Sequence, residues 1–371
     1  VLDQIGIHTN PASLHIVLPV GISFHTFHGM SYVFDIYREK QKPVTNIVDY
    51  AVFVGFFPLL VAGPIERANH LLPQVRNKRM FNYHQSIEGL KLLLWGMFKK
   101  VVIADSLAVL VDKIFLNYQD YNTTALIIGS VAFSFQIYGD FSGYSDIAIG
   151  TAKLLGFELC SNFKFPYFSR DIAEFWRRWH ISLSSWFKDY LYIPLGGSRF
   201  GKLKSIRNTF IIFLVSGFWH GANWTFIIWG GIHACGFLPL LLLNKNRNNL
   251  EIVAINREWP NLKELLQMLI TFTFVTFAWI FFRADTIRTA INFIKQIVKG
   301  GFGKSITNLN TIDITYSFTC IFVLIAFDWY MRRDERNLNF PSKYRYATYL
   351  ILGILVFFFF NSKTNFIYFQ F

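Results

Sequence analysis

The stretch Ser216-Gly217-Phe218-Trp219-His220-Gly221-Ala222-Asn223-Trp224 lies inside a long apolar run from Thr209 to Leu243. A run of this length is enough for one tilted membrane span or for two short ones. If a span begins at Thr209, His220 falls near the middle of the bilayer. Ionisable groups at that depth usually face a bundle interior or a water-filled cavity, and they mark a substrate path, a proton relay or a cofactor ligand. The alternative is a core histidine that is hydrogen-bonded to a neighbouring carbonyl.

The composition is that of a membrane protein with several spans. Of the 371 residues, 53% are hydrophobic, 19% are aromatic and only 16% are charged, whereas soluble domains carry about 25% charged residues. The formal net charge of +13 suits cytoplasmic loops and anionic headgroups. Basic residues are spread over many loops, so we expect membrane lipid and no nucleic acid as a partner. The cysteines, Cys160, Cys235 and Cys320, show neither metal-ligand nor disulfide spacing, and we expect no metal site.

Apolar segments recur along the chain with short breaks, and most are long enough to cross a bilayer. They cover residues 14–37, 47–65, 89–115, 124–149, 209–243, 262–282, 312–331 and 346–360. Pro19, Pro58 and the pair Lys99 and Lys100 interrupt the first three segments. Broken helices at membrane depth persist only where the freed backbone groups are buried in protein or line a cavity. The sequence therefore predicts an all-α fold, a polytopic transmembrane helix bundle with broken and re-entrant helices around a central cavity.

The chain shows no internal repeat, linker or second domain, which predicts a single membrane domain over residues 1–371. It opens at Val1 without an initiator Met or a signal peptide, and we expect its own beginning to be missing or processed. The basic loops at 199–207 and 332–345 are expected on the cytoplasmic side. Residues 286–299 carry an apolar stripe at helical spacing, which predicts an amphipathic helix at the membrane interface.

A second dense motif, rich in Trp and Arg, follows Ser169. Asp171 with Glu174 three residues later predicts a helix start. Beyond it, the side chains at i, i+3, i+4 and i+7 would share one face of a continuous helix. They are Trp176, Trp179, His180 and Leu183. Such a helix could lie in the membrane interface, or its paired Arg177 and Arg178 could bind the phosphates of a nucleotide-bearing donor.

Two carboxylates, Asp140 and Asp146, sit in an otherwise neutral apolar segment beside small residues and hydroxyls. Asp140 could orient a histidine or pair with an arginine of the Trp-rich motif. Local capping of a broken helix is an equal alternative.

Seven short motifs occur in order over nearly the whole chain. They are Pro19-Val20-Gly21-Ile22-Ser23-Phe24, Gly63-Pro64-Ile65, Asp140-Phe141-Ser142-Gly143-Tyr144, Phe175-Trp176-Arg177-Arg178-Trp179-His180, Tyr190-Leu191-Tyr192-Ile193-Pro194-Leu195-Gly196-Gly197, Trp219-His220-Gly221 and Phe366-Ile367-Tyr368-Phe369. Together they resemble the membrane-bound O-acyltransferase (MBOAT) family, and within it the branch of the alginate and peptidoglycan O-acetylation membrane subunits. The D-alanine transfer protein of teichoic acid synthesis shows a more distant resemblance to these motifs. The resemblance implies that the chain lacks the first transmembrane helices of the family, which would precede Val1.

The resemblance implies an O-acyltransferase in which His220 is the essential active-site histidine and His180 is a second, less strictly required polar position. A base would take the proton from an incoming hydroxyl while a hydrogen-bond donor steadies the oxyanion. The residues expected to contact the substrates are Arg177, Arg178, Trp179, Trp219, Asn223 and Asp140.

The resemblance also implies how the substrates arrive. No cofactor is expected to be bound, and acetyl-CoA or another acyl thioester is the donor substrate, which enters from the cytoplasm. The acceptor approaches from the outer side of a bacterial cytoplasmic (inner) membrane. The acyl group passes either to a separate extracytoplasmic acetyltransferase or directly to a polysaccharide.

Alternatives remain open at this point. A b-type haem protein could use His180, His220 or His233 as axial ligands, and a transporter also has broken helices and polar groups at the membrane midplane. His233 is otherwise expected to support the site from outside it. Ser216, one turn before His220, could act as a nucleophile, although we prefer direct transfer.

Overall fold

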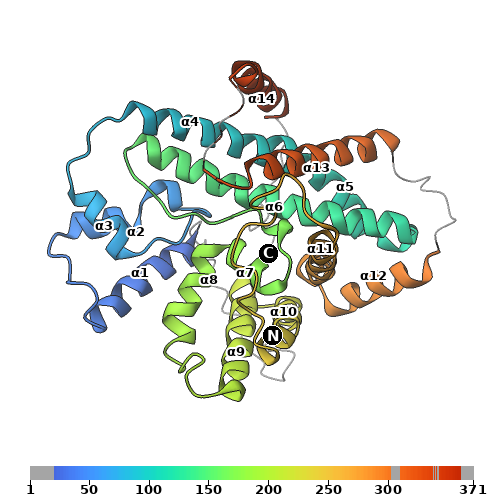
Figure 1. Ribbon diagram of the computed structural model, residues 1–371, viewed down its shortest axis with the longest axis horizontal. Coiled ribbons are helices and arrows are strands. Elements are labelled where there is room, and N and C mark those ends of the chain that lie inside the picture. The colour runs from blue at the N-terminus through green and yellow to red at the C-terminus, as the bar shows by residue number, and fades with distance from the viewer. Residues whose placement is uncertain (1–20, 302–309, 337, 339, 341, 361–371) are drawn as a thin grey trace, which may run out of the picture.

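The computed structural model describes residues 21–301, 310–336, 338, 340 and 342–360. Within these residues all regular structure is helical, and Figure 1 shows the helices gathered into one bundle. Residues 14–20 of the first apolar segment, with Pro19 and Val20 of the first motif, lie outside the described part of the chain. The closing motif at 366–369 also lies outside it.

In the described residues, four helices are long and apolar enough to cross a membrane. They are α6 (Thr123–Leu154), α10 (Trp224–Leu242), α11 (Leu262–Arg283) and α13 (Thr311–Met331). The other helices are α1 (Ile22–Tyr37), α2 (Ile47–Val54), η2 (Phe57–Leu59), α3 (Ala68–Arg76), α4 (Tyr83–Met97), η3 (Phe98–Ala104), α5 (Asp105–Leu116), η4 (Tyr118–Asp120), η5 (Pro166–Phe168), α7 (Ile172–Arg178), α8 (Ile181–Phe187), η6 (Lys188–Tyr192), α9 (Lys202–His220), α12 (Ile287–Lys299) and α14 (Arg345–Phe359). The prediction of a polytopic bundle with broken helices is confirmed, since the segments at 47–65, 89–115 and 209–243 each fold as more than one helix.

Glycines bring α4 and α6 together, and the two helices lie side by side (Figure 1). Gly89 faces Gly150 and Gly96 faces Gly143, so the two helices run antiparallel and meet at two points seven residues apart. A Cβ atom on Gly96 would lie only 2.5 Å from the carbonyl oxygen of Gly143. Small residues allow this close approach in a membrane, where the lipid supplies no hydrophobic force between helices.

The interruption of the third apolar segment by two lysines is a stretch of π-helix, η3, which turns both side chains toward α6. Lys99 Nζ lies 2.7 Å from a carboxylate oxygen of Asp146. Lys100 Nζ lies 2.7 Å from Asp140 and 2.6 Å from Asp105. Buried charges are tolerated when they are paired in this way. The lysines therefore hold η3 against α6.

The capping interpretation of Asp140 is wrong, because α6 continues unbroken through this residue from Thr123 to Leu154. Asp140 pairs with Lys100, whereas the pairing considered from the sequence was with an arginine of the Trp-rich motif. The two positions are 40 residues apart in sequence, so local spacing gave no signal for this pair.

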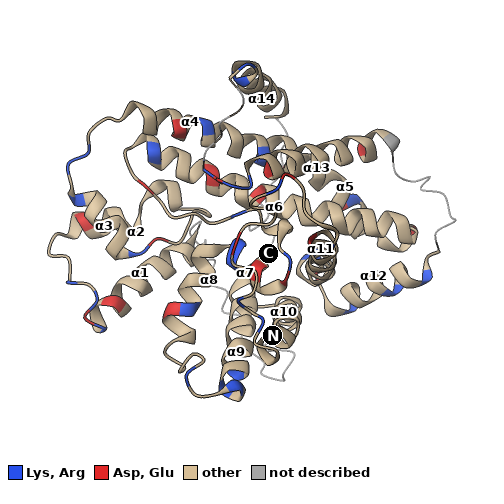
Figure 2. Cartoon of the chain, viewed as in Figure 1, with Lys and Arg blue, Asp and Glu red and all other residues tan. Residues whose placement is uncertain are grey.

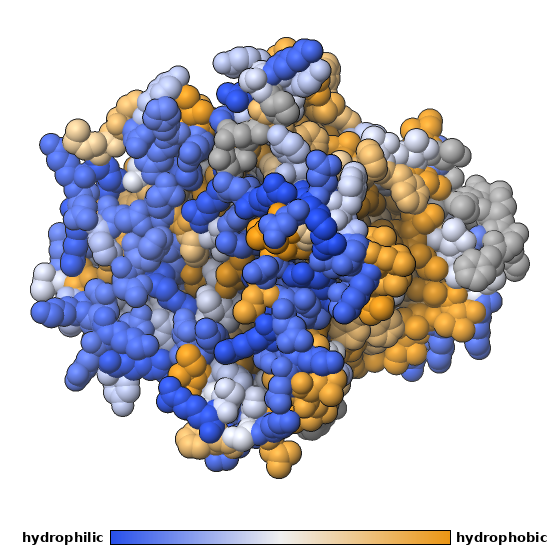
Figure 3. All heavy atoms as spheres, viewed as in Figure 1, coloured by the Kyte–Doolittle hydropathy of each residue, from blue (hydrophilic) through white to orange (hydrophobic). Residues whose placement is uncertain are grey.

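The amphipathic helix predicted at residues 286–299 is confirmed as α12. Its apolar stripe faces the protein: Phe293 is buried and stacks on Phe115 with 4.5 Å between ring centroids, and the Thr123 hydroxyl donates to the carbonyl of Ile297 at 2.7 Å. Ile291 and Val298 remain exposed. Hydrophobic residues gather on the side of the molecule where α5, α11 and α12 lie (Figure 3), as expected for a surface in contact with lipid.

Replacing Gly143 by Leu should separate α4 from α6, because the new side chain would meet the backbone of Gly96. Overpacking of this kind destabilises a protein by about 1–3 kcal/mol, and we expect a lower midpoint of thermal unfolding in detergent. Gly353→Leu is the matched control, since no atom of the described residues lies within 4 Å of a Cβ at that helical position. Equal midpoints for the two variants would contradict the close contact.

Candidate functional site

The apolar run around His220 folds as two helices, α9 and α10, joined at residues 221–223. Asn223 is the N-cap of α10, and its side-chain oxygen accepts from the backbone N–H of Thr225 at 3.2 Å. Its amide nitrogen donates to the carbonyl of Asp285 at 2.9 Å. The connection between the helices is therefore fixed, and Asn223 has a structural role beside the substrate contact expected of it.

Two further glycines set the distance between α9 and α10. A Cβ atom on Gly217 would clash with the backbone carbonyl of Phe226, and one on Gly230 would clash with that of Phe213. The helix backbones are thus in direct contact, which holds the end of α9 against the first turns of α10.

His220 is the last residue of α9 and lies among aromatic rings. Its imidazole centroid is 4.8 Å from that of Trp219, 5.1 Å from that of Trp229 and 5.2 Å from that of Phe282. The residue is half-buried. This is a mostly apolar setting with some access, which suits an imidazole that must stay neutral and still reach a substrate.

The continuous helical face predicted for Trp176 to Leu183 is wrong, because the helix breaks before His180. α7 ends at Arg178, and His180 adopts a left-handed backbone conformation with φ 44° and ψ 55° before α8 begins. That conformation costs a non-glycine residue about 1–2 kcal/mol.

Hydrogen bonds from a distant segment replace the missing helical ones. The Lys164 N–H donates to the carbonyl of Arg178, and the Ile181 N–H donates to that of Asn162, both at 2.9 Å. The helix start at Asp171 is confirmed, since its side chain accepts from the N–H of Glu174.

The fold brings His180 and His220 to one place, although they are 40 residues apart. The Trp219 ring lies 6.2 Å from that of His180 and 4.8 Å from that of His220, measured between centroids. His180 is only 1% exposed, and its Nδ1 lies 3.0 Å from the side-chain oxygen of Asn162. The two histidines and the indole between them form the candidate site.

Two other aromatic residues of the Trp-rich motif support the site from outside it. Trp179 is only 3% exposed and packs against Trp279, with 5.1 Å between centroids, which leaves little of its ring for a substrate. The Trp176 indole N–H donates to Nδ1 of His233 at 3.3 Å. His233 therefore lies in the wall behind the site.

The paired arginines expected to bind phosphates make bonds within the protein. Arg177 donates to the carbonyls of Asn246 and Asn249 at 2.9 and 2.7 Å. Burial lowers the pKa of the Arg177 guanidinium, and the nearby Asp171 carboxylate opposes that effect. Arg178 bonds to the buried Glu174 at 2.8 Å. A donor phosphate would have to share or replace these bonds, and phosphate binding here stays a prediction.

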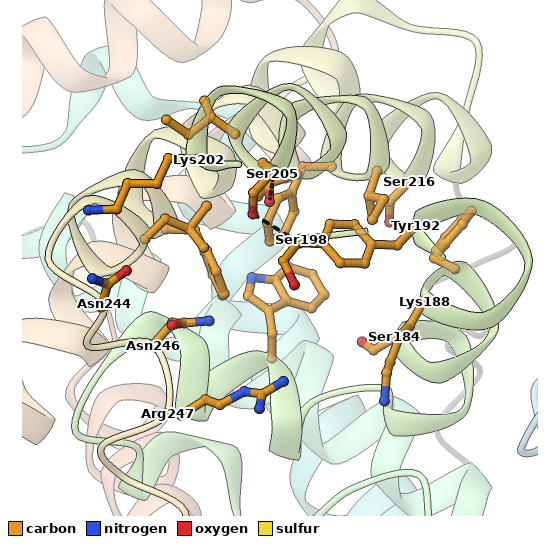
Figure 4. A pocket seen from close by; sticks show the side chains of 18 of the residues that line it. Ser184, Lys188, Tyr192, Ser198, Lys202, Ser205, Ser216, Asn244, Asn246 and Arg247 are labelled. Carbon is orange, nitrogen blue, oxygen red and sulfur yellow. Dashed lines mark hydrogen bonds between the residues drawn. The ribbon is translucent and has the colours of Figure 1, made fainter. Parts of the chain in front are cut away.

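A cavity of about 600 Å³ opens beside the site, between α8, η6, α9 and the end of α10. Its inner part is lined by Trp176, Leu183, Phe187, Thr209, Ile212, Phe213, Ser216 and Phe237. Its outer part carries hydroxyls, amides and three cations, Lys188, Lys202 and Arg247 (Figure 4). Ser216 lies one helical turn, about 6 Å, before His220. The cavity therefore leads from the protein surface almost to the candidate site.

The cations of the outer part are exposed, and they differ from the two lysines of η3 in having no carboxylate partner among the described residues. The Lys202 ammonium donates to the carbonyl of Leu242 at 3.3 Å. Figure 2 shows basic residues at this end of α9. The basic character of residues 199–207 is evident from the sequence, but the place of Lys188 and Arg247 at this cavity is not, because only the fold brings them beside that loop.

Comparison with known proteins shows to which family the chain belongs. Residues 24–257 match the family model described as MBOAT, membrane-bound O-acyltransferase family. The chain is 38% identical over 328 residues to the probable alginate O-acetylase AlgI of Pseudomonas syringae pv. tomato, which covers 86% of this chain and 61% of that protein. It is 39% identical over 324 residues to the peptidoglycan O-acetyltransferase of Helicobacter pylori, covering 80% and 60%.

A third relative is more distant. The teichoic acid D-alanyltransferase of Bacillus subtilis is 28% identical over 284 residues, covering 71% of this chain and 68% of that protein. The chain spans about 60% of the length of the two O-acetylating relatives. With the match to the family model and an all-helical bundle rich in apolar helices, these similarities show that the chain belongs to the membrane-bound O-acyltransferase family.

Proposed function

We propose that this chain moves an acyl group, preferably acetyl, from a cytoplasmic thioester such as acetyl-CoA to a hydroxyl during O-acetylation of an extracytoplasmic polysaccharide. It would do so as a multi-pass protein of the bacterial cytoplasmic (inner) membrane. The observation that carries this proposal is the cavity, which runs from exposed cations to Ser216, one turn before His220. The names of the alginate and peptidoglycan O-acetylating relatives support the reaction type.

The cavity suits a nucleotide-bearing thioester. Phosphates would meet Lys188, Lys202 and Arg247 at the outer part, where charge-assisted hydrogen bonds are available. The narrow arm that carries the thioester would lie against the apolar wall, which includes Phe187 and Phe213. This arrangement would bring the thioester to Ser216 and into the neighbourhood of His220.

The chemistry requires one base. A neutral nitrogen of His220 would take the proton of the acceptor hydroxyl as its oxygen attacks the thioester carbonyl. A C–O bond forms, the C–S bond breaks, and the leaving thiolate receives the proton from the His220 imidazolium. The reaction yields an ester and a free thiol, and His220 returns to its neutral form.

The acceptor would approach from the outer side of the membrane. Either a separate extracytoplasmic acetyltransferase receives the acetyl group first, or a polysaccharide hydroxyl receives it directly. An assay with labelled acetyl-CoA and candidate glycans, with and without a purified partner, distinguishes the two routes.

Removing the base should abolish transfer without unfolding the protein. We expect His220→Ala to lower the rate of acetyl transfer by about 100- to 10,000-fold. The rate is measured as labelled acetyl groups appearing on the acceptor. His84→Ala is the control, because His84 is an exposed histidine on α4. Near-normal transfer by His220→Ala would remove His220 from the mechanism, and an acyl group trapped on Ser216 would contradict direct transfer.

Removing a cation at the cavity opening should weaken donor binding. We expect Arg247→Gln to raise KM for acetyl-CoA about fivefold with kcat little changed, because one exposed charge contact contributes about 1 kcal/mol. Added salt should reduce the difference in KM for acetyl-CoA between this variant and the wild type, because salt screens exposed charges. Arg288→Gln, an exposed arginine on α12, is the control. A normal KM in Arg247→Gln, combined with a raised KM in Arg178→Gln, would move the phosphate site to the Trp-rich motif.

A further inference from the structure

Asn162 is a buried amide that contacts His180 from a segment outside the motifs recognised in the sequence. The residue is 1% exposed. Its side-chain oxygen lies 3.0 Å from Nδ1 of His180, 2.9 Å from the Ser182 hydroxyl and 3.3 Å from the Ser182 backbone nitrogen. Its amide nitrogen donates to the Ser145 hydroxyl at 3.2 Å.

These neighbours fix which way the amide points. A backbone N–H can only donate, so the Asn162 atom that faces the Ser182 N–H must be the oxygen. The reversed amide would place two donors against each other. The hydroxyl of Ser145 accepts from the nitrogen on the opposite side, which agrees with this orientation.

The orientation of the amide in turn fixes the tautomer of a neutral His180. Because Nδ1 faces an oxygen that has no hydrogen to give, Nδ1 must carry the proton and donate it. Nε2 is then an unprotonated acceptor. It is buried and has no hydrogen-bond partner among the residues that the structure describes.

We propose that Asn162 is a positioning residue that holds His180 with Nδ1 protonated, so that Nε2 accepts a hydrogen bond from a substrate. This inference rests on the proposed acyl transfer. The group that donates this hydrogen bond to Nε2 is an O–H or N–H group of a substrate. It is supplied either by the acceptor hydroxyl or by an amide of the arm that carries the thioester. Both would arrive near Trp219, which contacts His180 and His220.

The tautomer is measured directly by solid-state nitrogen NMR on ¹⁵N-histidine-labelled wild-type protein without substrate. The His180 signals are those missing from the spectrum of His180→Gln. We expect a protonated Nδ1 and a bare Nε2 in the wild type and in Ser145→Ala, because Ser145 contacts only the nitrogen side of the amide. A bare Nδ1 in the wild type would overturn the proposal, even if no Asn162 variant folds.

Variants at Asn162 test the positioning role. Asn162→Ala should show His180 with Nε2 protonated in part of the population, and its acetyl transfer should fall by about 10- to 100-fold, as when other groups that orient a histidine are lost. Asn162→Asp keeps an acceptor oxygen toward Nδ1 and should retain the tautomer and most of the rate. A raised KM for the glycan in Asn162→Ala assigns the bond to the acceptor hydroxyl, and a raised KM for acetyl-CoA assigns it to the thioester arm.

The outcomes separate this inference from the proposed function. An altered tautomer in Asn162→Ala with an unchanged rate and both KM values unchanged would overturn the positioning role. Equal losses in Asn162→Ala and Asn162→Asp with an unaltered tautomer would also overturn it. A wild-type protein that transfers no acyl group would refute the proposed function and with it the substrate contact, whereas the protonation pattern of His180 would stand.

Discussion

The contact between the backbones of α9 and α10 fixes where His220 lies. Gly217 and Gly230 make this contact, and any side chain at either position would push the helices apart. Because lipid offers no hydrophobic gain for helix association, such close packing is a main source of order within the membrane. A shift of about 1 Å in a catalytic group can lower a rate a hundredfold. The two glycines therefore matter for the position of the His220 imidazole as well as for the stability of the bundle.

The pairing of charged groups separates structural ions from those available to a ligand. Lys99 and Lys100 each lie within 2.7 Å of a carboxylate from α6, so their positive charges are already balanced inside the bundle. Lys188 and Arg247 at the cavity opening have no such partner among the described residues and remain in contact with solvent. A negatively charged substrate would thus meet its strongest attraction at the cavity and little in the bundle core.

Much of the architecture followed from the sequence, because apolar length and helix-breaking residues act locally. The interruption at Lys99 and the amphipathic helix α12 could be predicted in this way, whereas the length of the 209–243 run allowed either one tilted span or the two helices that form. The break before His180 could not, because it depends on Asn162, a residue 18 positions away that supplies hydrogen bonds in place of the helical ones. Arg247 was missed for the same reason, since it joins the cavity only through the fold.

Acyl transfer from a thioester to a hydroxyl releases no net proton, because the proton taken from the hydroxyl ends on the leaving thiol. In the proposed mechanism, His220 would therefore be regenerated in each turnover and would need no relay to bulk water. Its packing against Trp219, Trp229 and Phe282 is consistent with this requirement. The same rings would keep water from hydrolysing the thioester. A polar site lined by aromatic residues thus suits transfer to an alcohol better than it suits hydrolysis.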